Sequence, residues 1–351
     1  MPTATRAAMP GLTRARREAD VAASNVDHDR GTDLLRPDKR KAKAGMSNPP
    51  EIPEMPELLA TGDTRGPDFI CIGAQKGGTR WLFDQLDHHP QFWMPPIKEL
   101  HYFDRSNRFL KKAGPLYQRA SASLAEANRR RERAYERRLE AVDVEWLAAR
   151  IWLHGRPIDF DRYARLFNPR SNRLAGDICP PYAIIPDERA KAIRERFPAA
   201  RIVYLVREPI ARFWSQYCML LRRNERADPA GIEQVRSFAT SGNGLRHSSI
   251  REVVARWRTS EDDDRFRVFF FDDLKTDPVS LRSRILAFLG ADADRESGGL
   301  ATDFNRKKEQ AKVEMTDEVR DYLIPLFADE IRGAADTLGG PALEWPGKYG
   351  L

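Results

Sequence analysis

The stretch GAQKGGTR, residues 73–80, constrains this chain more than any other part of its sequence. The apolar run at residues 69–72 predicts a buried strand before it, and the apolar positions among residues 81–86 predict a helix after it. The glycines allow a sharp turn, so backbone N–H groups and the positive end of the helix dipole face the turn. The order of strand, glycine-rich turn and helix therefore predicts a site for a phosphate or sulfate group.

The turn differs from the P-loop of nucleotide triphosphatases at an informative position. Gly73 and Gly78 have the P-loop separation, but Thr79 and Arg80 stand where a P-loop has Lys followed by Ser or Thr. The lysine lies inside the turn instead, at Lys76. We expect Lys76 to direct its charge toward an anion held by the turn, whereas in an ordinary strand-turn-helix corner it would be a solvated lysine.

A second strand-to-helix corner follows later in the chain. Residues 201–206 predict a buried strand that ends at Arg207, and residues 210–221 predict a helix that carries Ser215. At this point the chain resembles the sulfotransferases that use 3′-phosphoadenosine 5′-phosphosulfate (PAPS). Their first motif contains KGGT after the first strand, and their second has an arginine at a strand end followed by a serine on the next helix. Both motifs occur here in the right order, which makes the resemblance specific.

Three further segments resemble the carbohydrate-type branch, which includes the heparan sulfate sulfotransferases and bacterial relatives. KELHYFD at residues 98–104 is similar to that branch's E-x-H-F-F-D, and GDICPPY at residues 176–182 is similar to its E-K-T-P-x-Y, with Ile178 where several members have lysine. Residues 267–278 resemble its late strand and E-D-L-x-x-D-P turn. The resemblance covers residues 66–346.

The predicted fold is α/β, a three-layer P-loop-type domain with a central, mainly parallel sheet flanked by helices. Near-continuous apolar runs at residues 69–73, 201–206 and 267–271 are typical of strands in a parallel sheet that is covered on both faces. Residues 66–351 would form this domain, with a helical insertion at about 105–160 that includes a charged stretch from Ser121 to Trp152. That stretch is either a solvated helix docked by one apolar stripe or a lid over the acceptor. Residues 1–65 predict a disordered or loosely attached tail, and translation could start at Met1 or Met46.

The resemblance and the position of these residues at strand ends imply one donor site. Lys76 would stabilise the charge that develops on the bridging oxygen of the leaving 3′,5′-bisphosphate. The residues that would hold the donor's phosphosulfate and 3′-phosphate groups are Lys76, Gly77, Gly78, Thr79, Arg80, Arg207 and Ser215, with Arg306 and Lys307 as weaker candidates. The resemblance implies that no metal is required.

The acceptor hydroxyl needs a general base, and the KELHYFD segment supplies two candidates. Glu99 occupies the family position of the base, and His101 is the second candidate. Alternatively, Glu99 forms a surface salt bridge with Lys98, and His101 is a hydrogen-bonded structural imidazole. The expected partners are PAPS, 3′,5′-ADP and a hydroxyl-bearing acceptor, which the resemblance implies is a glycan.

The composition of the chain limits which classes of protein it can belong to. The net charge of +7 accompanies abundant acidic residues, so we expect no nucleic-acid partner. The sequence shows no membrane span or signal-peptide core, and the resemblance is to cytoplasmic bacterial members. Three cysteines without metal-ligand spacing predict reduced thiols and no zinc site. The oligomeric state stays open.

Two other functions stay open at this point. A P-loop nucleotide kinase would use the same sheet and turn, and a non-catalytic module would bind anionic glycans without consuming PAPS. The sequence does not reveal which acceptor is sulfated.

Overall fold

The structure, a computed structural model, describes residues 50–224, 231–260, 263–295, 299–304 and 313–351. The chain divides into two units, residues 1–44 and residues 45–351, and every described residue belongs to the second. Of the expected tail, residues 1–65, the structure therefore describes only residues 50–65.

A parallel sheet forms the centre of this unit. Its strands are β1 (Phe69–Gly73), β2 (Phe92–Trp93), β3 (Leu174–Ile178), β4 (Arg201–Val206) and β5 (Phe266–Phe270), in the order β2-β3-β1-β4-β5. Neighbouring strands in this order run parallel to each other, and Cys71 of β1 lies beside Ile178 in β3 and Val203 in β4. The predicted strands at residues 69–73 and 201–206 are confirmed, and the third begins one residue earlier than predicted.

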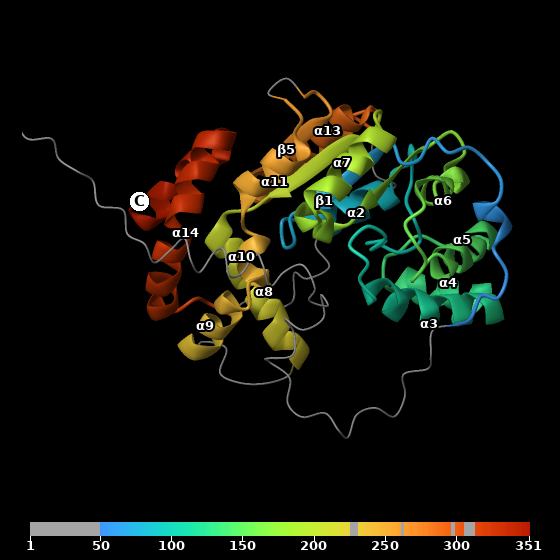
Figure 1. The fold of residues 1–351 in the computed structure, drawn as a ribbon, viewed down its shortest axis with the longest axis horizontal. Helices are drawn as coiled ribbons and strands as arrows, with labels where there is room; N and C mark the ends of the chain where they lie inside the picture. The colour runs from blue at the N-terminus through green and yellow to red at the C-terminus, as the bar shows by residue number, and fades with distance from the viewer. Residues whose placement is uncertain (1–49, 225–230, 261–262, 296–298, 305–312) are drawn as a thin grey trace, which may run out of the picture. The chain divides into compact units, whose positions relative to one another are not determined.

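Helices connect the strands and cover both faces of the sheet (Figure 1). They are α2 (Thr79–Asp87), α3 (Arg108–Ala122), α4 (Leu124–Arg133), α5 (Ala141–Trp152), α6 (Phe160–Arg165), α7 (Asp187–Arg196), α8 (Pro209–Asn224), α9 (Ile232–Thr240), α10 (Asn243–Arg246), α11 (Ile250–Trp257), α12 (Phe271–Thr276), α13 (Pro278–Leu289) and α14 (Asp317–Leu338).

Alternating strand residues divide the core into two layers. Phe69, Cys71 and Val203 point to one face, where they pack with the apolar residues of α2 and α13. Ile70 and Ile202 point to the other face, where the core includes residues of α7, α11 and α14. Because side chains alternate between the faces of a strand, this division gives three layers of helix, sheet and helix. The predicted α/β fold class is confirmed.

The insertion contains several short helices instead of one long one. Ser123 ends α3 and caps α4, because its hydroxyl accepts a hydrogen bond from Glu126 N at 3.2 Å. The predicted helical stretch from Ser121 to Trp152 is then interrupted between α4 and α5. In Figure 1, α3, α4 and α5 lie together on one side of β1, and α8, α9 and α14 lie on the other.

Residues 50–65 differ from the loosely attached segment that we expected. The Leu59 side chain is fully buried in the same core cluster as Ile70. Leu58 N donates a hydrogen bond to Glu145 Oε1 at 2.9 Å, and Arg165 donates one to the Leu59 carbonyl at 3.0 Å. The packed part of the chain thus begins before residue 66, because two apolar residues inside a polar, proline-rich segment are a weak signal in sequence.

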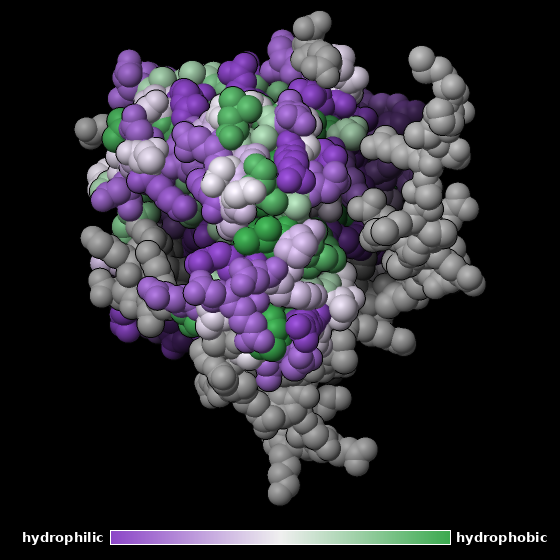
Figure 2. All heavy atoms as spheres, turned by 90° about the vertical axis from the view of Figure 1, so that its left-hand side faces the viewer, coloured by the Kyte–Doolittle hydropathy of each residue, from purple (hydrophilic) through white to green (hydrophobic). Residues whose placement is uncertain are grey.

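The surface in Figure 2 is mostly hydrophilic, with apolar side chains in small groups. Among the helices of the described ranges, none is long and apolar enough to cross a membrane.

Candidate functional site

The loop after β1 lies against the backbone of β4. Ala74 N donates a hydrogen bond to the Leu205 carbonyl at 2.6 Å. A Cβ atom at Gly77 would collide with the same Leu205 carbonyl oxygen, and Gly78 has a φ of 99°. Glycine is therefore required at both positions, once for close approach and once for backbone conformation.

The N-terminus of α2 offers backbone N–H groups at this loop. The first helical hydrogen bond runs from Leu82 N to the Gly78 carbonyl at 3.2 Å, so the N–H groups of the three residues before Leu82 precede the helical ladder. The first turn of α2 contains no acidic side chain. An anion is favoured at such a helix end by the N–H groups and by the helix dipole.

The neighbouring helix α8 differs, because a side chain already caps it. Glu208 accepts hydrogen bonds from Ile210 N and Ala211 N, both at 2.7 Å, and from the Tyr349 hydroxyl at 2.8 Å. Burial, only partly offset by these donors, raises the Glu208 pKa. Of the helix N-termini after β1 and β4, the one of α2 is thus the better anion site.

Arg207 joins the two corners. It follows β4 directly, and its guanidinium donates a hydrogen bond to the Lys76 carbonyl at 3.2 Å. The same group lies over the Phe271 ring, 4.4 Å from its centroid, while its buried Nε has no hydrogen-bond partner among the described residues. Burial lowers the Arg207 pKa. A half-buried guanidinium with an unused N–H beside the loop can donate a hydrogen bond to a phosphate oxygen.

Ser215 lies on α8 between two residues that interact with the loop and with Arg207. One turn before it, Arg212 donates hydrogen bonds to the Gln75 carbonyl at 3.5 Å and the Ser248 hydroxyl at 2.6 Å. One turn after it, burial raises the pKa of Cys218, and the nearby charges of Arg222, Lys76 and Arg207 act in the opposite direction. The helix face that carries Ser215 therefore runs along the loop.

Arg80 points elsewhere. Its guanidinium pairs with Asp84 at 3.1 Å and with Glu136 of the insertion at 3.3 Å. Its backbone N–H lies in the first turn of α2, but its side chain connects this helix to the insertion.

The Glu99 segment lies at the same edge of the sheet, beside the end of β3. Asp177 in β3 accepts a hydrogen bond from Leu100 N at 3.4 Å, and Cys179 N donates to the Cys71 carbonyl of β1 at 3.0 Å. Burial raises the pKa of Asp177 to about 6. Ile178, at the position where family members often have lysine, is buried in the core layer under α2.

Glu99 lies among cationic groups. Lys98 Nζ is 2.6 Å from Glu99 Oε1, and Lys112 Nζ and His101 Nε2 are 3.7 and 3.4 Å from Oε2. Burial acts to raise the Glu99 pKa, but these cations together hold it well below its usual range. Glu99 is therefore an ionised carboxylate, and its side chain is 26% exposed.

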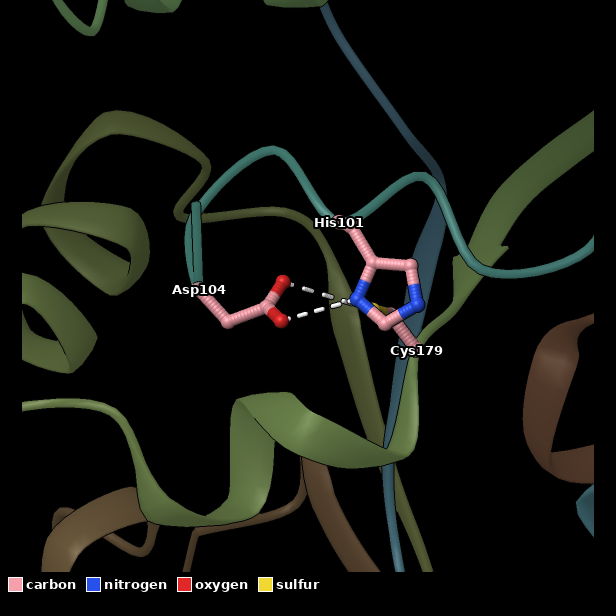
Figure 3. A group of neighbouring side chains, drawn as sticks. All are labelled: His101, Asp104 and Cys179. Carbon is pink, nitrogen blue, oxygen red and sulfur yellow. Dashed lines mark hydrogen bonds and ion pairs between the residues drawn. The ribbon is translucent and has the colours of Figure 1, made fainter. Parts of the chain in front are cut away.

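His101 bridges Glu99 and Asp104. Its Nδ1 is 2.8 Å from Asp104 Oδ2, and Cys179 Sγ is 3.9 Å from both Nδ1 and Asp104 Oδ1. Figure 3 shows the Asp104 carboxylate directed at the imidazole, with Cys179 next to the ring. Burial acts to lower the His101 pKa, but hydrogen bonds to Asp104 and Glu99 raise it overall. His101 thus holds its proton more firmly than a free histidine.

Arg306 and Lys307 lie outside the described residues. The described segments on either side of them contact the two helices at the site. The Thr302 carbonyl accepts a hydrogen bond from Trp81 Nε1 of α2 at 2.6 Å, and the Val313 carbonyl accepts one from Trp214 Nε1 of α8 at 2.9 Å.

Sequence reasoning missed the structural importance of Arg212 and the contact of Cys179 with His101. Arg212 is almost completely buried, its hydrogen bonds within the described part of the chain go to neutral groups, and burial lowers its pKa to about 9. Its signal was an arginine among apolar residues at helical spacing, between Ile210 and Phe213. The Cys179 contact has no such signal, because it depends on the pairing of distant segments.

Comparisons with known proteins agree with this geometry. The model of the sulfotransferase family matches residues 67–295, more than half of the chain. A sulfotransferase from Alicyclobacillus acidocaldarius shares the fold with a TM-score of 0.51 and 22% identity over 80% of this chain and 98% of that chain. No curated protein matches the sequence significantly.

Two further solved structures are similar. The sulfotransferase domain of the Synechococcus PCC 7002 olefin synthase has a TM-score of 0.45 at 22% identity, over 72% of this chain and 86% of that chain. A sulfotransferase from Mycobacterium avium has a TM-score of 0.45 at 16% identity, over 81% of this chain and 79% of that chain. On the extent of the family match, this chain belongs to the sulfotransferase family.

Proposed function

We propose that this protein transfers a sulfuryl group from PAPS to a hydroxyl group of a carbohydrate acceptor, without a metal in the reaction. The contact between the Arg207 guanidinium and the Lys76 carbonyl carries this proposal. It joins the glycine-rich loop after β1 to the arginine after β4. These two strands are neighbours in the sheet, and their connections lead in opposite directions, which is where ligands bind in open α/β folds.

The residues present fit this donor. The N-terminus of α2 suits the 5′-phosphosulfate, because its first turn has no acidic side chain and Gly77 leaves room only for backbone. Arg207, with its buried and unused Nε, suits the 3′-phosphate, together with Ser215 on the adjacent helix. PAPS, when bound, would supply an activated sulfuryl group on a phosphate leaving group.

Lys76 acts on the leaving group in this proposal. It lies in the loop at a φ of 72°, between β1 and the N-terminus of α2. A cation there stabilises negative charge that develops on the bridging oxygen during transfer, and a preorganised donor of this kind is worth about 10²- to 10³-fold in rate. Lysine and backbone N–H groups would take the role that magnesium has in phosphoryl transfer.

Glu99 orients the acceptor hydroxyl and takes its proton. Its low pKa makes it a weak base, so it would accept the proton late, when bond formation to sulfur has made the hydroxyl acidic. The carbohydrate acceptor rests on the resemblance of residues 98–104 to the carbohydrate-type branch.

Titration with 3′,5′-ADP in the presence of EDTA tests the donor site. We expect the parent protein to bind 3′,5′-ADP without metal, and Arg207→Ala to bind it at least about tenfold more weakly, because charge-assisted hydrogen bonds contribute roughly 1.5–3 kcal/mol. Arg236→Ala is the matched control, since Arg236 is an exposed residue of α9 that pairs with Glu233.

The same titration separates the alternatives. Binding of ATP that requires magnesium, with no binding of 3′,5′-ADP, would support a nucleotide kinase. Binding of a sulfated glycan without consumption of labelled PAPS in the presence of candidate acceptors would support a non-catalytic module.

A further inference from the structure

His101, Asp104 and Cys179 bring a nitrogen, an oxygen and a sulfur donor together in the interior of the protein. All three side chains are buried, and Cys179 is fully buried. They come from two segments that are distant in sequence, since Cys179 follows β3 and the other two belong to the KELHYFD segment. We propose that this cluster binds one Zn²⁺ ion through His101 Nδ1, a carboxylate oxygen of Asp104 and Cys179 Sγ.

The distances are close to those of a tetrahedral zinc site. With Zn–S near 2.3 Å and Zn–N or Zn–O near 2.0–2.1 Å, the sulfur lies about 3.5 Å from the other two donors, which lie about 3.3 Å from each other. Here the sulfur is 3.9 Å from His101 Nδ1 and from Asp104 Oδ1, and Nδ1 is 2.8 Å from Asp104 Oδ2. These distances differ from the tetrahedral values by about half an ångström.

The surroundings of His101 give a second, independent reason. A metal-ligating histidine typically donates its other ring N–H to a carboxylate, which fixes the ring and its tautomer. Glu99 Oε2 is 3.4 Å from His101 Nε2, on the side of the ring away from Asp104. At this distance the two atoms form an ion pair and not a well-aligned hydrogen bond, so Glu99 needs a small shift to complete the carboxylate–histidine arrangement that supports a metal ligand.

The protons and charges balance. Zinc would replace the proton on His101 Nδ1 and the thiol proton of Cys179, and both protons go to solvent, while the Nε2 proton stays and faces Glu99. The Asp104 carboxylate and the Cys179 thiolate then neutralise the charge of the ion. Three protein donors leave the fourth position for a water molecule.

Zinc at this place would fix the position of the His101 ring beside Glu99, the base of the proposed function on which this consequence rests. The donor half of the site, at Lys76 and Arg207, lies at other strand ends, so we expect the affinity for 3′,5′-ADP to stay unchanged.

Titration of the folded, reduced protein with Co²⁺ tests the site directly. Co²⁺ bound by a thiolate gives a charge-transfer absorption band, and the chain has only three cysteines, Cys71, Cys179 and Cys218. We expect one Co²⁺ per chain, displaced by Zn²⁺, which binds such sites more tightly than Co²⁺. The band should disappear in Cys179→Ser and persist in Cys218→Ser, the matched control at another buried cysteine.

Two further variants keep the test decisive if Cys179→Ser does not fold. Asp104→Asn retains the thiol and should bind Co²⁺ at least tenfold more weakly, and Glu99→Gln should weaken binding by about 10- to 100-fold, as loss of an outer-shell partner does. The absence of a band in the parent, its survival in folded Cys179→Ser, or unchanged Co²⁺ affinity in Asp104→Asn overturns the proposal. Failure of sulfuryl transfer in the parent would instead refute the proposed function and leave the Co²⁺ result valid.

Discussion

Lys76 occupies a backbone conformation that is uncommon for a residue with a side chain. Its φ is 72°, and its carbonyl accepts the hydrogen bond from Arg207. The loop thus fixes the backbone of Lys76 between the two corners of the site. The contribution of its ammonium group can then be separated from the fold, because alanine keeps the same backbone.

We predict that Lys76→Ala lowers the rate of sulfuryl transfer by about 10²- to 10³-fold, the typical effect of removing one preorganised donor. The melting temperature should stay within a degree or two of the parent, as for other surface changes. Transfer of labelled sulfate from PAPS measures the rate. Lys191→Ala on α7 is the control, because Lys191 is 68% exposed and pairs with Glu195 on the same helix. Near-parental turnover of a folded Lys76→Ala protein would contradict the mechanism.

The pKa shifts of Glu99 and His101 separate the two candidate bases. Glu99 has a pKa well below its usual value and is ionised at neutral pH, whereas the raised pKa of His101 keeps that ring protonated to a higher pH. If Glu99 is the base, it stays ionised from pH 7 down to its ordinary pKa of 4.5, so the rate should not fall in that range. The rate should fall only at lower pH, where Glu99 becomes protonated. With His101 as the base, the rate should instead rise with pH through a pKa above 6.5.

We predict that Glu99→Gln reduces the rate of transfer by at least about 100-fold while 3′,5′-ADP binds as in the parent, because a positioned base contributes roughly 10²- to 10⁴-fold. The measurements are the rate of the variant and the pH profile of the parent. Full activity in Glu99→Gln, together with a rate that rises with pH through a pKa above 6.5, would assign the base to His101. Full activity in both Glu99→Gln and His101→Ala would mean that the segment is structural.

For single residues, the sequence best predicts roles that depend on residues nearby in the chain. The glycines at 77 and 78 follow from the turn that they form, and the structure requires both. The contact of Arg80 with Glu136 could not be predicted, because Glu136 lies 56 residues away in an insertion without a recognisable signature. The same holds for Cys179, whose neighbour His101 is 78 residues away.

At the level of elements, predictability follows length and composition. β1 and β4 are long apolar runs and were predicted at their observed bounds. β2 has two residues, and β3 has the sequence LAGDI, so neither has the pattern of a strand in isolation. Their pairing with β1 gives them their structure, which is a tertiary effect that local propensity does not contain.

The insertion is held to α2 by buried charges. Arg137 pairs with Asp143 at 2.7 Å and with Asp87 of α2 at 3.4 Å, and the two aspartate side chains are 1% and 2% exposed. Burial raises the pKa of Asp87, and the charge of Arg137 opposes that shift. Removing the arginine would leave both carboxylates buried without their main cation.

We therefore predict that Arg137→Ala lowers the free energy of unfolding by about 3–5 kcal/mol, the usual cost of breaking a buried ion pair from one side. Urea denaturation measures this difference. Arg138→Ala is the matched control, because the neighbouring Arg138 is 67% exposed and pairs with Glu132 at the surface. Its loss should cost at most about 1 kcal/mol. Equal effects of the two variants would show that the Arg137 pairs do not hold the insertion.

For the whole molecule, the open question is where the folded unit begins. Residues 45–351 form one unit, and within it Leu59 belongs to the main core although it precedes β1. The family resemblance begins at residue 66 and therefore leaves out Leu59, which packs in the core of the domain. We expect the shortest stable chain to include every residue that packs in this core, and not to begin where the motifs begin.

We predict that a chain starting at Met46 unfolds with the same free energy as the full chain and binds 3′,5′-ADP equally well. In that shorter chain, Leu59→Ala should cost about 2–5 kcal/mol, because it leaves a cavity in a packed core. Met55→Ala in the same segment is the control, since Met55 is 39% exposed and little apolar contact is lost. Denaturant melts of the four proteins decide the matter. If removal of residues 1–45 costs as much as Leu59→Ala, the first unit supports the fold; if Leu59→Ala costs no more than Met55→Ala, the folded domain begins only near β1.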